Sequence, residues 1–65
     1  MSDLRLRPLL LGVEEAAVML GIGRSTLYGL LRRGELRAIH IGRSTRLTMA
    51  ELERYVDALH QRTLT

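Results

Sequence analysis

The sequence contains no cysteine, no lysine, no tryptophan and no phenylalanine, and only one of its 65 residues is proline. Without cysteine, neither disulfide bonds nor a thiolate metal site can stabilise the fold. No apolar run approaches the ~20 residues that a helix needs to cross a bilayer, and the leucines at 9–11 are too few for a signal peptide. We therefore expect a cytoplasmic protein of one domain, with no membrane as a partner.

The shortness of the chain also argues against an enzyme. A domain of this size buries only about 60 % of the surface that its unfolded chain exposes, which leaves no room for a catalytic cleft beside a core. His40 and His60 fall on different expected elements, so they form neither a metal site nor a catalytic pair. Ser25 and Thr26 have no accompanying base that would activate a hydroxyl nucleophile. We predict no enzymatic activity, no bound metal and no cofactor.

All ten basic residues are arginine, and most of them lie in the middle of the chain. Residues 24–46 hold six arginines against Glu35, a net charge of +5, whereas residues 1–23 and 47–65 each carry a net charge of −1. Arginine binds phosphate or guanine through two hydrogen bonds, although a GC-rich genome also favours arginine codons. A local basic footprint of this kind indicates a polyanionic partner.

Residues 13–33 have the pattern of a helix-turn-helix. Four apolar residues recur at i, i+3, i+4 and i+7 and form one face of a first helix: Val13, Ala16, Ala17 and Leu20. Gly12 is the expected N-cap and Gly21 the expected left-handed residue at the C-terminal end. A second helix should cover residues 24–33, and its hydrophilic start suits contact with base edges in a major groove.

A β-hairpin with a basic tip is expected directly after the second helix. Its strands would be residues 37–41 and 45–48, with residues 42–44 as the turn. Alternation predicts that Ile39, Ile41 and Leu47 point inward against the helices. On the solvent face, His40 should pair across the hairpin with Arg46.

A third helix is expected to begin at Thr48, because Thr48 and Glu51 have the spacing of a capping box. Apolar residues then recur at helical spacing: Met49, Leu52, Tyr55 or Val56, and Leu59. So small a domain needs this stripe to close its core, and we therefore expect the stripe to be buried rather than to bind a partner.

The order of these motifs resembles the excisionase family of winged-helix DNA-binding proteins, which are related to the DNA-binding domain of the MerR regulators. The matching segments are Val13-Glu-Glu-Ala-Ala17, Leu20-Gly-Ile-Gly-Arg-Ser-Thr-Leu-Tyr28, Arg32-Arg-Gly-Glu-Leu36, Ile41-Gly-Arg43 and Arg46-Leu-Thr-Met-Ala-Glu-Leu52. The resemblance covers residues 10–61 and implies a mainly α fold with a small β-hairpin, a winged helix-turn-helix. The domain would span residues 10–62, between a flexible arm at 1–9 and a tail at 63–65.

The resemblance also implies a function, that of a phage or mobile-element excisionase, also called a recombination directionality factor. Such a protein binds specific double-stranded DNA near an attachment site, often with other copies of itself, bends the DNA and directs an integrase towards excision. A small MerR-like transcriptional regulator is the alternative within the same fold. A protein-interaction module without DNA binding is a third possibility, which the concentration of charge on the second helix and hairpin disfavours.

The residues expected to contact DNA lie on the second helix and on the hairpin. On the recognition helix they are Arg24, Ser25, Thr26, Tyr28, Gly29 and Arg32, and on the wing they are His40, Arg43, Ser44 and Arg46. Arg24 is expected to read a base edge, and Arg43 to enter the adjacent minor groove. Tyr28 either contacts DNA or covers the edge of the core. Gly29, expected at an exposed position, reflects sequence drift or lets the helix backbone approach DNA closely.

Overall fold

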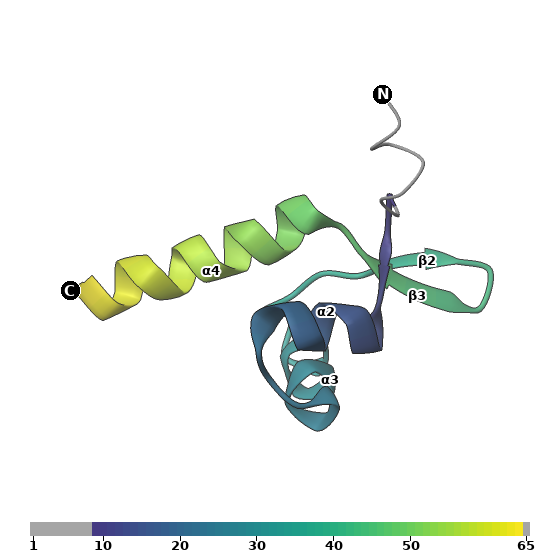
Figure 1. The fold of residues 1–65 in the computed structure, drawn as a ribbon, viewed down its shortest axis with the longest axis horizontal. Helices are drawn as coiled ribbons and strands as arrows, with labels where there is room; N and C mark the ends of the chain where they lie inside the picture. Colours follow the sequence, from purple (N-terminus) through teal and green to yellow (C-terminus); the bar gives the residue numbers. More distant parts are fainter. Residues whose placement is uncertain (1–8, 65) are drawn as a thin grey trace.

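The computed structural model describes residues 9–64, which form three helices and three short strands (Figure 1). In chain order these are β1 (Leu11–Gly12), α2 (Val13–Leu20), α3 (Arg24–Arg32), β2 (Ile39–Ile41), β3 (Ser44–Leu47) and α4 (Met49–Leu64). The two short helices lie together, whereas α4 and the hairpin of β2 and β3 extend in opposite directions. This arrangement confirms the predicted winged helix-turn-helix. Residues 1–8 of the predicted arm lie outside the described residues, and α4 continues through residues 63 and 64 of the predicted tail.

Glycines delimit α2 as the sequence predicts. Gly12 is the N-cap, and its N–H donates to the Oε1 atom of Glu15 at 2.8 Å, so the glutamate satisfies the backbone donor of the N-cap residue. At the other end Gly21 has a φ of 71°, in the left-handed region that glycine adopts without steric cost. The turn then leads to Arg24 as the first residue of α3.

The hydrophobic core joins the helix-turn-helix to the sheet. Leu27 of α3, Leu36 of the following loop and Leu47 of β3 are the largest fully buried side chains. Ala16 and Ala17 of α2 are buried as well, and their small side chains allow α2 and α3 to pack closely. This shared core holds α3 in a fixed orientation relative to the hairpin, the two elements that carry the predicted DNA contacts.

A third strand, which the sequence did not predict, completes the sheet. β1 pairs with β3 in antiparallel fashion, with Leu11 opposite Leu47 and Gly12 opposite Arg46, so the strand order is β1-β3-β2. A strand of two residues is too short to show alternation, and Gly12 was explained by its role as a cap. Because of β1, the strand β3 is central in the sheet and Leu11 is buried.

The register of the hairpin contradicts the predicted orientation of its isoleucines. The pairs across the hairpin are Ile39 with Arg46, His40 with Thr45 and Ile41 with Ser44. Because residues alternate between the faces of a strand, Leu47 shares its face with Thr45 and His40, and both isoleucines lie on the other face. Ile39 and Ile41 are 43 % and 59 % exposed, whereas Leu47 is fully buried. The prediction that the two isoleucines point inward is therefore wrong.

The length of the turn explains this error. A turn of three residues at 42–44 would place Ile39 opposite Leu47, but the turn has only the two residues Gly42 and Arg43. A register shift of one residue moves every side chain of a strand to the other face. Gly42 has a φ of 60°, which is the conformation that a two-residue hairpin turn with glycine in first place requires.

Most of the apolar stripe of α4 is exposed, contrary to the prediction that it is buried. Leu52 is buried and Tyr55 packs against the core. Met49, Val56 and Leu59, however, are 40 %, 47 % and 38 % exposed. Only the first two turns of α4 meet the core, because the helix has 16 residues against eight in α2 and nine in α3 and extends beyond both (Figure 1). Leu59 lies past these two turns. Met49 and Val56 lie within them, but they border an open hollow between α4 and the end of α2.

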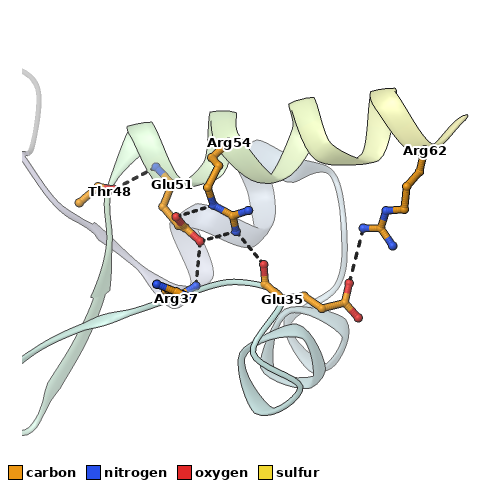
Figure 2. Close-up of polar contacts among 6 residues, drawn as sticks. All are labelled: Glu35, Arg37, Thr48, Glu51, Arg54 and Arg62. Atoms are coloured by element: carbon orange, nitrogen blue, oxygen red, sulfur yellow. Dashed lines mark hydrogen bonds and ion pairs between the residues drawn. The ribbon is translucent and has the colours of Figure 1, made fainter. Parts of the chain in front are cut away.

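A network of polar side chains holds the start of α4 against the loop that follows α3 (Figure 2). The N–H of Glu51 donates to the hydroxyl of Thr48 at 3.0 Å, which confirms the predicted cap. The carboxylate of Glu51 points to the loop, where it accepts the N–H of Arg37 at 2.9 Å. It also accepts two hydrogen bonds from Arg54, at 2.9 and 2.7 Å, and Arg54 donates to the carbonyl oxygen of Glu35 at 2.8 Å. The network thus attaches α4 to the segment between recognition helix and wing.

This network predicts a pH-dependent part of the stability. The hydrogen bonds from Arg54, with a smaller effect of the Arg37 N–H, lower the pKa of Glu51 below its ordinary value of 4.5, and partial burial opposes this shift. Because the folded-state pKa is lowered, the contribution is present in full above pH 4.5 and is lost as the pH falls through the lowered pKa. Glu51→Gln should therefore reduce the free energy of unfolding by about 1–2 kcal/mol at pH 7 and by much less at pH 3, as measured by thermal melts. Glu53→Gln, on the same helix, is the control, and an equal loss at both pH values would contradict the assignment.

Candidate nucleic-acid interface

The first turn of α3 presents Arg24, Ser25 and Thr26 to solvent. Leu27 and Leu30 of the same helix are buried and anchor it to the core. The exposed start of the helix therefore carries two hydroxyl groups that can bond to phosphates and one guanidinium that can reach a base edge. A recognition helix requires this combination of a fixed body and a free first turn.

Tyr28 lies where α3 faces the wing. It is 43 % exposed and borders two open hollows. The first hollow, of about 540 Å³, is lined by residues 12–15, by Tyr28 and by residues 43–46 of the wing. The second is lined by Tyr28, the end of α3, the following loop, His40 and Thr45. Part of the tyrosine thus covers the protein and part is open to a ligand. Its position is compatible with both predicted roles, contact with DNA and cover of the edge of the core.

The wing contributes four predicted site residues, which the structure separates into two groups. Arg43, Ser44 and Arg46 line the first hollow together with Tyr28, and Arg43 and Ser44 are exposed. Arg46 is half-buried, and its Nη1 donates to the carbonyl oxygen of Thr45 at 3.0 Å. His40 lines the second hollow instead.

The prediction that His40 pairs with Arg46 is wrong. His40 lies opposite Thr45 in the hairpin, and its Nδ1 atom is 3.5 Å from the threonine hydroxyl. Arg46 lies on the other face of the sheet, opposite Ile39 and Gly12. The shorter turn that reverses the isoleucines is also the cause here, because it shifts each cross-strand partner by one position.

Gly29 is buried, contrary to the prediction of an exposed position. A Cβ atom on Gly29 would lie 3.3 Å from Nη1 of Arg33 and 3.8 Å from Nη2 of Arg32. Two guanidinium groups therefore cover the glycine, and the missing side chain makes room for them. A DNA backbone that approached Gly29 would first meet these arginines, so a direct contact of Gly29 with DNA stays a prediction.

The two arginines at the end of α3 differ in their partners. Arg33 forms an ion pair with Glu35, with 3.0 Å between its Nε and the carboxylate. Arg32 is exposed and makes no ion pair with any residue in the range 9–64. Arg32 is thus the more available of the two for a phosphate, and its contact with DNA stays a prediction.

Glu14 is at the edge of the same surface, although it is not among the predicted site residues. Its carboxylate forms an ion pair with the guanidinium of Arg24, and Glu14 also lines the first hollow. The two residues are ten positions apart in the chain, and a glutamate in the first turn of a helix is already explained by the helix dipole. No local sequence pattern indicates this pair, because it depends on how α2 packs on α3.

Two comparisons with known proteins match this chain. A family model described as a helix-turn-helix domain matches residues 10–60. A probable excisionase from Saccharopolyspora erythraea is 42 % identical over 50 residues, which are 77 % of this chain and 51 % of that protein. The chain thus spans about half the length of the curated relative that it matches. No solved structure shows a significant match. No helix within residues 9–64 is long and apolar enough to span a membrane.

Proposed function

The chain belongs to the family of helix-turn-helix domains, and from this premise we propose that it is a sequence-specific DNA-binding protein of the excisionase type. The observation that carries the proposal is the hollow between α3 and the wing, where Tyr28 meets three polar wing residues: Arg43, Ser44 and Arg46. A recognition helix enters the major groove with its first turn, and a hairpin beside it reaches the next minor groove. The identity with a probable excisionase favours that function over other helix-turn-helix activities.

In this proposal each element of the interface has a distinct task. Arg24 reads a base edge, since arginine can bond to both acceptors of guanine in the major groove. Ser25, Thr26 and Arg32 contact phosphates and set the position of the helix without reading sequence. Arg43 enters the minor groove, where a narrow groove concentrates negative potential.

We further propose that several copies bind side by side, bend the DNA and favour excision by an integrase. A single domain of this size contacts few bases, so neighbouring copies and the deformability of the DNA must contribute to specificity. The integrase performs the strand exchange, and this protein supplies the geometry of the DNA. Double-stranded DNA, an integrase and further copies of the chain are its proposed partners.

Footprinting on the DNA that flanks its own gene tests this function. We expect several adjacent protected sites near an attachment site, enhanced cleavage between them where the DNA bends, and stronger protection when the neighbouring integrase is present. A single protected site over a promoter that does not respond to the integrase would instead favour the small MerR-like regulator. The absence of any protection would contradict both functions.

Binding should also depend steeply on salt. Each phosphate that an arginine neutralises contributes about −0.9 to the slope of log K against log salt concentration. With about five such contacts, affinity should fall by about two to three orders of magnitude between 50 and 200 mM salt, as measured by fluorescence anisotropy. A neutral osmolyte at matched osmolality is the control and should have little effect. An affinity that is nearly independent of salt would rule out arginine-phosphate contacts as its main source.

A further inference from the structure

An acidic side chain lies at the edge of the proposed DNA-binding surface, beside the first arginine of α3. Glu14 is the second residue of α2, and its carboxylate forms an ion pair with Arg24, the first residue of α3. The two side chains are 73 % and 62 % exposed. Glu14 also lines the hollow that contains Tyr28 and the wing arginines. A negative charge at this place repels DNA phosphates, so it weakens the binding that the surrounding arginines provide.

The helix dipole favours an acidic residue in the first turn of α2, but the stability of the fold does not account for the ion pair between this glutamate and Arg24. Exposed ion pairs contribute little to stability, because both partners remain hydrated and lose conformational freedom when they pair. The neighbouring Glu15 provides the contrast: its carboxylate accepts the N–H of Gly12 at 2.8 Å and caps α2. Within residues 9–64, the carboxylate of Glu14 accepts a hydrogen bond from Arg24 and from no other residue. The ion pair must therefore be explained by what it does to Arg24.

We propose that Glu14 is a specificity-determining residue that positions Arg24 for a base edge and keeps this arginine away from phosphates. The inference rests on the proposed DNA-binding function and adds a determinant of selectivity to it. The pair uses the Nη1 atom of Arg24. A guanidinium carries five N–H donors in a rigid fork, so the opposite edge of Arg24 stays free to donate to two acceptors at once. Guanine presents such a pair, N7 and O6, in the major groove.

The same carboxylate discriminates against complexes in which Arg24 lies on the DNA backbone. In a complex with an unrelated sequence, arginines bind mainly to phosphates, and Glu14 then faces a like charge. In a complex with the preferred sequence, Arg24 remains paired with Glu14 while it contacts the base. Glu14 therefore lowers the affinity for all DNA and lowers it more for unrelated sequences.

The experiment compares Glu14→Gln with the full-length wild-type chain on two duplexes. One duplex is selected by the wild type from a randomised double-stranded pool, and the other is a scrambled version of it. Glu14→Gln should bind the scrambled duplex about fivefold more tightly, the effect of one charge pair at contact distance in water, and its salt slope should steepen by about 0.9. Its affinity for the selected duplex should change by less than twofold, so the ratio of the two affinities falls about fivefold. Glu53→Gln makes the same charge change on α4 and should leave the ratio unaltered.

The Arg24→Ala background tests whether Glu14 acts through the arginine. In that background Glu14→Gln should leave the ratio of affinities unchanged, because no guanidinium remains to be positioned. An equal loss of the ratio in both backgrounds would overturn the positioning role and assign base contact to Glu14 itself. If Glu14→Gln in the otherwise wild-type chain leaves the ratio of affinities unchanged, the role of Glu14 is overturned and the proposed DNA-binding function is not affected. If the wild type selects no preferred duplex, the proposed function fails together with it. Circular dichroism melts verify that each variant is folded.

Discussion

Replacing Leu47 by alanine should unfold a large part of the protein at physiological temperature. Leu47 is fully buried in the central strand β3, opposite Leu11 of β1, and belongs to the one core cluster of residues 9–64. A buried Leu→Ala change costs about 2–5 kcal/mol, and a domain below about 80 residues rarely has more than about 3–5 kcal/mol of net stability. The thermal midpoint should fall by about 10–40 °C, because each kcal/mol shifts a domain of this size by about 4–8 °C.

Leu59→Ala is the matched control for this prediction. It makes the same chemical change, but Leu59 lies on the part of α4 beyond the core and is 38 % exposed. Its midpoint should stay within about 5 °C of the wild type, because surface substitutions rarely exceed 0.5 kcal/mol. Equal effects of the two variants would mean that the end of α4 packs as firmly as the sheet, and the extended position of α4 (Figure 1) would then be wrong.

The two short helices could be predicted because their signals are local. The glycines at 12 and 21 mark where the chain enters and leaves the first helix, and the structure confirms the start and end of α2 and the start of α3. The cap at Thr48 is equally local, since its hydroxyl bonds a residue three positions along the same chain. Such contacts depend on a few consecutive residues, so a local sequence pattern is enough to predict them.

The sheet and the packing of α4 were not predictable in the same way, because each depends on residues far apart in the chain. The partner of Leu47 is Leu11, 36 positions earlier, and no local pattern indicates this pairing. The face of the sheet on which Ile39 and Ile41 lie depends on whether the hairpin turn has two or three residues. Val56 is exposed because it borders an open hollow between α4 and the end of α2, which the helical spacing of one segment cannot reveal.

The sequence indicates which residues could contact DNA, but it does not indicate how these residues are arranged in space. The structure brings Tyr28 of α3 and the tip of the wing to one hollow, but the first turn of α3, residues 24–26, does not line it. Gly29 under the guanidinium groups of Arg32 and Arg33, and Glu14 beside Arg24, follow only from the way α2 and α3 pack. The selectivity that we assign to the interface thus depends on tertiary contacts, whereas its charge is evident from composition.

Arg43→Ala should weaken DNA binding by about 1–3 kcal/mol, about a 5- to 150-fold loss of affinity. Arg43 is exposed in the two-residue turn at the end of the hairpin, and it makes no ion pair with the other residues of the range 9–64. Its removal should therefore leave the melting curve unchanged. Because its proposed contact is with the minor groove rather than with a major-groove base edge, the loss should be similar on all sequences with the same groove width. The salt slope should become shallower by about one unit.

Two further substitutions separate this role from those of other arginines. Arg24→Ala should reduce affinity and also relax the sequence preference, since Arg24 is the residue proposed to read a base. Arg62→Ala removes the same charge from the far end of α4, where Arg62 lies 3.9 Å from Glu35 (Figure 2), and should change DNA affinity by less than twofold. The three variants have equal net charge, so only their positions distinguish them. If Arg43→Ala binds like the wild type while Arg62→Ala does not, the DNA contact lies on α4 and the wing has another role.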